Sequence, residues 1–182
     1  MTRIVGDRVT LRGFRDDELD RLVEVATAAP TDDGIHWGPT DRASIRQRIA
    51  SSGVWSHGHL ILAIEADGEL VGEVQARSVR GGMPTGVFEL GIDVFDPAER
   101  GRGLGSAAVV ELTRHLFLEE AAHRVQLSTD VANAPMRRVA ERLGFGFEGV
   151  MRGFMPTGDG PHDYALYAIT KDDYEDMETR WT

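Results

Sequence analysis

The chain has 182 residues, of which 41% are hydrophobic and 27% charged, proportions typical of one globular domain with a full core. No apolar run reaches membrane-spanning length and the first residues lack the apolar core of a signal peptide, so we expect a cytoplasmic protein without a membrane partner. The formal net charge of −10 disfavours nucleic acid and favours cationic small molecules or basic peptides as partners. The absence of cysteine excludes disulfides, thiolate metal sites and any acyl-cysteine mechanism.

Hydrophobic spacing in the first half of the chain predicts a strand, two helices and a pair of strands. In chain order these are residues 8–14, 16–29, 41–51 and 59–79. The Asp67-Gly68 pair in the last range is typical of a tight hairpin turn. An antiparallel arrangement is therefore expected here.

The strand predicted at residues 86–95 has two unlike faces. Its core face carries four apolar side chains, Phe88, Leu90, Ile92 and Val94. The other face presents Glu89 and Asp93, four residues apart, with Gly91 leaving room between them. Two carboxylates on a non-core face are candidates for general acid–base work, or are ordinary solvent-facing groups on a half-exposed strand.

The second half predicts a helix, a strand, a second helix, two strands and a closing helix. The first helix carries apolar residues at every fourth position from Leu104 to Leu116, and the second begins at the N-cap Asn133 and ends at Gly144. The strands fall at 123–130, 145–155 and 162–170, and the last helix at 171–181. The order predicts a mixed α/β fold in one domain, 1–182, with a twisted sheet of about seven strands flanked by helices.

A glycine-rich turn, "RGRGLG" at residues 100–105, joins the strand 86–95 to the first of these helices. Glycines at a helix start let an anion approach free backbone N–H groups. A Walker-type loop would need a lysine before Ser106, which is missing. A dinucleotide fingerprint, with Gly101, Gly103 and Ser106 followed by Asp130, fits poorly because "DPAER" separates the strand from the glycines.

The remaining pattern, R-x-x-G-x-G/A at Arg100, Gly103 and Gly105, resembles the turn of the GNAT superfamily of N-acetyltransferases. A second segment, "NAPMRRVAERLGFGFEGVMRG" from Asn133, and the closing "DYALYAI" strengthen the resemblance, which covers nearly the whole chain. It is most similar to the Rim-type branch (RimJ/RimL-like), which acetylates ribosomal-protein N-termini, and to polyamine- and antibiotic-modifying relatives. The resemblance implies acetyl-CoA as co-substrate, no metal, and a diphosphate held by six residues of the turn: Arg100, Gly101, Arg102, Gly103, Gly105 and Ser106.

Acetyl transfer to an amine needs a base, a donor to the carbonyl oxygen and a source of protons for the leaving thiolate. We expect Glu89 to be the base, directly or through water, with Asp93 as the second candidate. The resemblance implies that the Val94 N–H, at a bulge in its strand, binds the carbonyl oxygen, that Phe95 contacts the pantetheine arm, and that Asn133 hydrogen-bonds this arm. Relatives carry a tyrosine or serine acid at positions that are Ala140 and Met136 here. The proton is therefore expected from Tyr164 or water, or the thiolate leaves unassisted.

The acceptor is an amine, and the sequence does not identify it. His36 and Trp37 are candidate substrate contacts because their loop precedes the helix that covers the acceptor site in relatives. The resemblance also makes a homodimer an expectation. A basic protein N-terminus, a polyamine and an aminoglycoside all fit the excess of acidic over basic residues. Two alternative functions stay open: transfer from another acyl donor such as succinyl-CoA, and a non-catalytic CoA-binding module.

Overall fold

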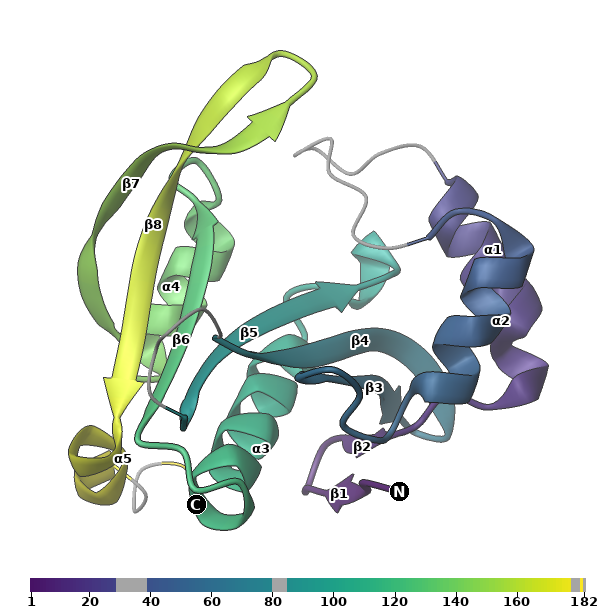
Figure 1. The fold of residues 1–182 in the computed structure, drawn as a ribbon, viewed down its shortest axis with the longest axis horizontal. Helices are drawn as coiled ribbons and strands as arrows, with labels where there is room; N and C mark the ends of the chain where they lie inside the picture. The colour runs from purple at the N-terminus through teal and green to yellow at the C-terminus, as the bar shows by residue number, and fades with distance from the viewer. Residues whose placement is uncertain (29–38, 80–84, 178–180, 182) are drawn as a thin grey trace.

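The computed structural model describes residues 1–28, 39–79, 85–177 and 181 (Figure 1). In these residues the strands are β1 (Ile4–Val5), β2 (Thr10–Arg12), β3 (His59–Ala66), β4 (Glu69–Ser78), β5 (Val87–Val94), β6 (Arg124–Asp130), β7 (Gly146–Thr157) and β8 (Gly160–Thr170). The helices are α1 (Leu19–Thr27), α2 (Arg42–Ser51), α3 (Leu104–Glu119), α4 (Ala134–Arg142) and α5 (Lys171–Met177), with short 3₁₀ helices at Asp16–Glu18 and Pro97–Glu99.

The predicted mixed α/β fold and the order of its elements are confirmed, with one difference in strand number. The described residues form a sheet of eight strands, where the sequence predicted about seven. The additional strand, β1, is two residues long and pairs with β2 through Ile4 and Leu11. Two residues are too short for an alternating hydrophobic pattern, which is why this strand leaves no signal in the sequence.

The strands lie in the order β1-β2-β3-β4-β5-β6-β8-β7. All neighbours are antiparallel except β5 and β6, which are parallel and joined by the crossover through α3. The last strand of the sequence, β8, lies between β6 and β7.

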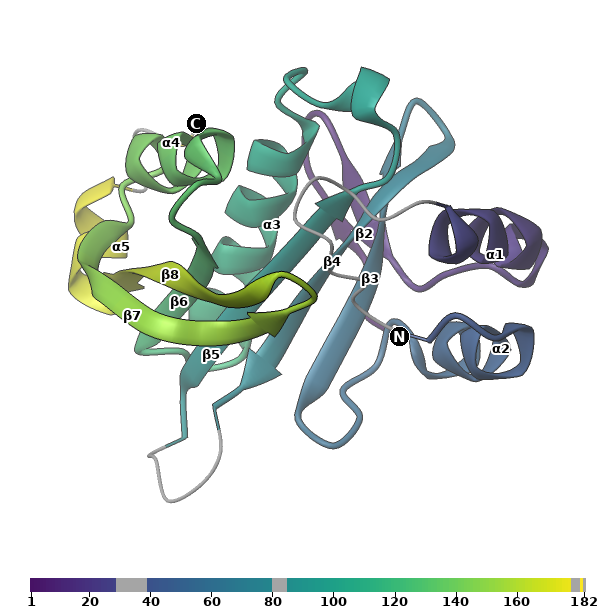
Figure 2. The same cartoon turned by 90° about the horizontal axis from the view of Figure 1, so that it is seen from above.

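Helices cover both faces of the sheet (Figure 2). On one face the predicted stripe of α3 packs into the larger core, where Leu112 and Leu116 are fully buried. On the other face α1 and α2 pack together over β3, through Leu22, Ile45 and Ala63 among others. The N-terminal half of the sheet is therefore enclosed between α3 and the α1–α2 pair.

Strands β5 and β6 diverge along their length (Figure 1). Their parallel pairing runs from Val87↔Arg124 to Leu90↔Leu127 and stops there, although both strands continue. Beyond Leu90, no strand among the described residues takes up the free edge of β5. The sheet is thus opened at its centre.

Candidate active site

A cavity of about 360 Å³ lies where β5 and β6 part. One group of its lining residues comes from the interior, on the side of α3 and α4: Leu90, Ile92, Val109, Leu127, Thr129, Asn133 and Met136. The other group is mostly polar and aromatic: Glu73, Gln75, Arg77, Glu89, Gly91, Asp93, Ser128, Asp130, Phe154, Met155 and Tyr164. The cavity therefore connects an apolar side to a side rich in carboxylates.

Glu89 is held at the point where the two strands separate. Arg77 Nη2 of β4 lies 2.9 Å from its Oε1 atom, and Gln126 Nε2 of β6 lies 3.3 Å from its Oε2 atom. Asp93, three residues beyond the last paired residue Leu90, has a side chain 48% exposed and lies 4.0 Å from Arg100 Nη2. The two predicted acid–base candidates thus line one cavity in different surroundings.

A third carboxylate, Glu73 of β4, lies beside them and is buried. Its register partner on β5 is Asp93, and Arg48 of α2 donates a hydrogen bond to its Oε1 atom. Burial raises the pKa of Glu73, and the charge of Asp93 adds to this, against the opposing effect of Arg48. Glu73 was not among the site residues predicted from sequence, although Glu73, Gln75 and Arg77 alternate with apolar residues along the chain.

At the other wall, Asp130 and Tyr164 are register partners on β6 and β8. The Nδ1 atom of His162 lies 2.6 Å from Asp130 Oδ2, and Asp159 lies 3.1 Å from the other ring nitrogen. The bond to Asp130 and the contact with Asp159 raise the pKa of His162. Tyr164, the acid predicted from sequence, lines the cavity and is buried, with its ring centre 5.5 Å from that of Phe154.

The backbone of β5 offers donors to the opened edge. Phe95 N–H donates to Val71 O of β4 at 3.0 Å, and bonded and non-bonded pairs alternate along an antiparallel ladder. The N–H groups of Ile92 and Val94 therefore point away from β4, toward the side where β6 stops pairing at Leu90. The bulge expected at Val94 is not present: the β4–β5 register is continuous there. Strand divergence, not a bulge, leaves these N–H groups available.

The glycine-rich turn forms the start of α3, as predicted. Gly103 is the N-cap with φ +83°, so the N–H groups of the first helical turn have no carbonyl partner within the helix. Arg100 Nε donates to Val94 O at 3.1 Å, which ties the turn to the end of β5. A Cβ at Gly105 would lie 3.3 Å from Ile92 Cδ1, so this glycine allows α3 to pack closely on β5.

Two further arginines reach this turn from distant parts of the chain. Arg8 Nη2 donates to Arg102 O at 2.7 Å, and Arg142 Nη2 of α4 donates to Ser106 Oγ at 3.1 Å. Arg102 itself is paired with Glu99. The sequence could not show that Arg8 and Arg142 lie here, because their proximity arises only from the tertiary fold.

The remaining predicted residues occupy three different settings. Asn133 caps α4, with its Oδ1 atom accepting from Met136 N–H at 3.1 Å, and it lines the cavity. The Phe95 side chain packs with the α1–α2 cluster, away from α3, which argues against its predicted contact with a pantetheine arm. His36 and Trp37 lie outside the described residues.

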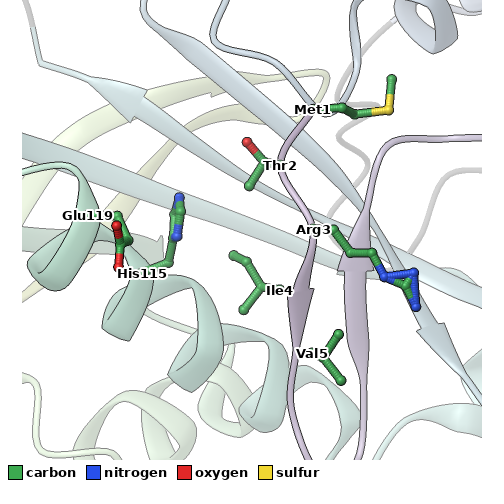
Figure 3. A pocket seen from close by; sticks show the side chains of 7 residues that line it. All are labelled: Met1, Thr2, Arg3, Ile4, Val5, His115 and Glu119. Atoms are coloured by element: carbon green, nitrogen blue, oxygen red, sulfur yellow. The ribbon is translucent and has the colours of Figure 1, made fainter.

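A second depression lies between the N-terminal segment and α3 (Figure 3). Its lining residues are Met1, Thr2, Arg3, Ile4, Val5, His115 and Glu119. It contains none of the predicted site residues, so it is a poor candidate for the chemistry. Within the described part of the chain, no group of three or more histidine, aspartate or glutamate side chains is arranged to hold a metal ion, and no helix is long and apolar enough to cross a membrane.

Residues 8–146 match the acetyltransferase (GNAT) domain family, and the chain belongs to this family. Over 96% of its length it is 29% identical to the SPbeta prophage-derived N-acetyltransferase YokL of Bacillus subtilis, of which it covers 97%. It is 26% identical to the putative ribosomal N-acetyltransferase YdaF of the same organism, over 94% of this chain and 96% of that one.

Solved structures show the same fold. One is RimL, a ribosomal L7/L12 alpha-N-protein acetyltransferase in complex with coenzyme A, with a TM-score of 0.78 at 18% identity over 94% of this chain and 99% of that one. Membership of the acetyltransferase (GNAT) family makes the chain an acetyl-CoA-dependent acetyltransferase, with acetyl-CoA as its co-substrate.

Proposed function

We propose that the protein transfers the acetyl group of acetyl-CoA to a primary amine by direct attack within a ternary complex. The observation that carries this proposal is the cavity between β5 and β6, which joins the face of α3 and α4 to a face lined by Glu73, Glu89, Asp93 and Asp130. Thioester and amine can meet in such an opening from opposite sides of the sheet. The absence of cysteine leaves direct attack as the simplest route.

The residues on the α3 side suit an acyl-CoA. The free N–H groups at the start of α3, with Arg100 and Arg102 nearby, suit a diphosphate. The Val94 N–H would donate to the thioester oxygen as negative charge develops there, with the Ile92 N–H as a neighbouring donor. The amide nitrogen of Asn133, whose oxygen is used by the cap, would donate to the pantetheine arm.

The residues on the carboxylate side suit a cationic acceptor. A basic protein N-terminus is the acceptor we favour, because the chain resembles the Rim-type branch and YdaF carries a ribosomal description. Polyamines and aminoglycosides are the alternatives. Tyr164 would return a proton to the leaving thiolate, and the carboxylates of the cavity would supply the base. The proposed location is the cytoplasm, and a homodimer is the proposed assembly; both rest on the sequence and its resemblance.

The first experiment is thermal unfolding with acetyl-CoA, CoA, succinyl-CoA, NAD and ATP in parallel. A ligand at 100 times its Kd stabilises the folded state by about 2.7 kcal/mol, which shifts the midpoint visibly. Acetyl-CoA and CoA should raise it, whereas NAD and ATP should not. A larger shift with succinyl-CoA than with acetyl-CoA would indicate a different acyl donor.

The second experiment measures transfer to basic N-terminal peptides, spermidine and an aminoglycoside with a thiol reagent. Because the chain has no cysteine, every thiol detected comes from CoA. Acetylated product and free thiol should appear together in equal amounts. Acetyl-CoA binding without turnover on any of these amines would reject all three acceptor classes.

A further inference from the structure

Glu73 is the most buried of the carboxylates that line the cavity on β4 and β5. Its side chain is 10% exposed, against 21% for Glu89 and 48% for Asp93. Glu73 and Asp93 are directly opposite on neighbouring strands, so their side chains share one face of the sheet and their charges repel. Burial and this repulsion both favour the protonated form of Glu73, and its pKa is raised.

The other carboxylates of the cavity are less suited to taking a proton from the acceptor. Both oxygens of Glu89 accept hydrogen bonds, from Arg77 and Gln126. Both oxygens of Asp130 are also used, by a backbone N–H and by His162. The Asp93 side chain is about half exposed to water and lies 4.0 Å from Arg100 Nη2, so it is the most solvated carboxylate of the cavity.

Arg48 fixes the Glu73 carboxylate in place. It comes from α2, the helix that packs with α1 on the carboxylate face of the sheet, and bonds to the Oε1 atom of Glu73. Within the part of the chain that the structure describes, the Oε2 atom is then the one available for a proton. Glu73 lines the cavity, and Asp93 lies opposite it on β5.

We propose that Glu73 is the catalytic base of the acetyl transfer, and that Arg48 is its positioning residue. This inference rests on the proposed function, and it moves the role of base from Glu89, which the sequence favoured, to a residue of the neighbouring strand.

Protons and electrons balance in the proposed reaction. The acceptor ammonium gives one proton to Glu73 Oε2 and becomes a neutral amine. Its nitrogen lone pair forms a bond to the thioester carbon, the carbon–sulfur bond breaks, and the bonding electron pair leaves on the CoA sulfur. The second proton of the new N-acetyl nitrogen passes to the thiolate through Tyr164 or water. Glu73 then releases its proton to solvent, so each turnover yields the amide, CoA thiol and one proton.

The charged groups that face Glu73 in the described residues are few. From α2 there is Arg48, and from β5 there is Asp93. On β3 the register partner of Glu73 is Ala63, which carries no charge. The protonation of Glu73 therefore depends on Arg48, on Asp93 and on burial. Removing the charge of Arg48 should raise the pKa of Glu73 further.

The decisive measurement is the pH profile of kcat/KM for the wild type, Glu73→Gln, Glu89→Gln and the control Glu69→Gln. Glu69 lies on the same strand but is exposed and outside the cavity. Glu73→Gln should lower kcat by about 10²–10⁴-fold and remove the acidic limb of the profile, while acetyl-CoA still raises its unfolding midpoint. Glu89→Gln should keep that limb, and Glu69→Gln should match the wild type.

Two results would overturn the inference. The first is a Glu73→Gln variant that keeps the acidic limb with kcat within tenfold of wild type. The second comes from Arg48→Met, which is used if Glu73→Gln does not fold: loss of the Arg48 cation should move the acidic limb to higher pH, and an unmoved limb contradicts the role of Glu73. Absence of turnover by the wild type on every amine is a different failure, which rejects the proposed function and this inference with it.

Discussion

Arg77 and Glu89 form an ion pair across β4 and β5, with 2.9 Å between Nη2 and Oε1. Gln126 of β6 reaches the other carboxylate oxygen, so Glu89 links three strands just before β5 and β6 part. A carboxylate bonded on both oxygens holds the closed end of the opening together. Because both of its oxygens are bonded, Glu89 is better suited to a structural role than to the role of base, although it lines the cavity.

The first prediction concerns this link. Glu89→Gln should lower the free energy of unfolding by about 1 kcal/mol, because the ion pair is partly exposed and the glutamine retains some hydrogen bonding. It should lower kcat by less than about tenfold, an effect of about 1.4 kcal/mol on the barrier. Urea unfolding and steady-state kinetics measure the two effects. A loss of 100-fold or more would return the role of base to Glu89.

A second prediction tests the turn at the start of α3. Gly103 has φ +83°, and a Cβ there would lie 2.7 Å from Arg8 Nη1 at the helix start proposed to hold the diphosphate. Gly103→Ala should therefore weaken acetyl-CoA binding by at least about tenfold, which corresponds to about 1.4 kcal/mol. The left-handed backbone conformation should also cost the variant about 1 kcal/mol of stability.

The matched control for this turn is Gly68→Ala. Gly68 has φ +84° in the β3–β4 hairpin, where an added Cβ would meet no atom of the described residues within 4 Å. It should show the same loss of stability by thermal unfolding and unchanged affinity for acetyl-CoA by titration calorimetry. Equal affinities for the two variants would remove Gly103 from the cofactor site.

The local elements of this fold were predictable from sequence because their signals are local. The Asp67-Gly68 turn does adopt left-handed conformations, with φ +52° and +84°, and Asn133 does cap α4. Each depends on residues within a few positions of one another, where backbone preference and side-chain hydrogen bonds decide the outcome.

The assembly of the site was only partly predictable because it depends on pairing between distant segments. Glu89 and Asp93 were found from their shared face on one strand, whereas Glu73 becomes notable only once the β4–β5 register sets it opposite Asp93. The placement of Arg8 beside Gly103, far away in the sequence, likewise follows from the packing of β2 and α3 near their ends. No local pattern encodes such contacts.

A third prediction tests the proposed acid. Tyr164→Phe keeps the ring against Phe154 and removes the hydroxyl, so kcat should fall by about 10²-fold while acetyl-CoA affinity is retained. The control is Tyr167→Phe, whose hydroxyl bonds to Arg137 and Glu141 away from the cavity. The control should lose about 1 kcal/mol of stability and little activity. If both variants have wild-type kcat, water is the acid.

The fourth prediction follows from His162, whose pKa is raised by its bond to Asp130 and its contact with Asp159. A raised pKa in the folded state means that the stabilisation is fully present below the unfolded value, about 6.5, and is lost as pH rises through the folded pKa. The stability difference between wild type and His162→Gln should therefore be largest just below about pH 6.5 and decline as the pH rises above it. Asp159→Asn, which leaves the bond to Asp130, should reduce this pH dependence without abolishing it. Urea unfolding at several pH values measures the free energy of unfolding of both variants and of wild type. A difference between wild type and His162→Gln that grows with pH would show that His162 is neutral in the folded protein.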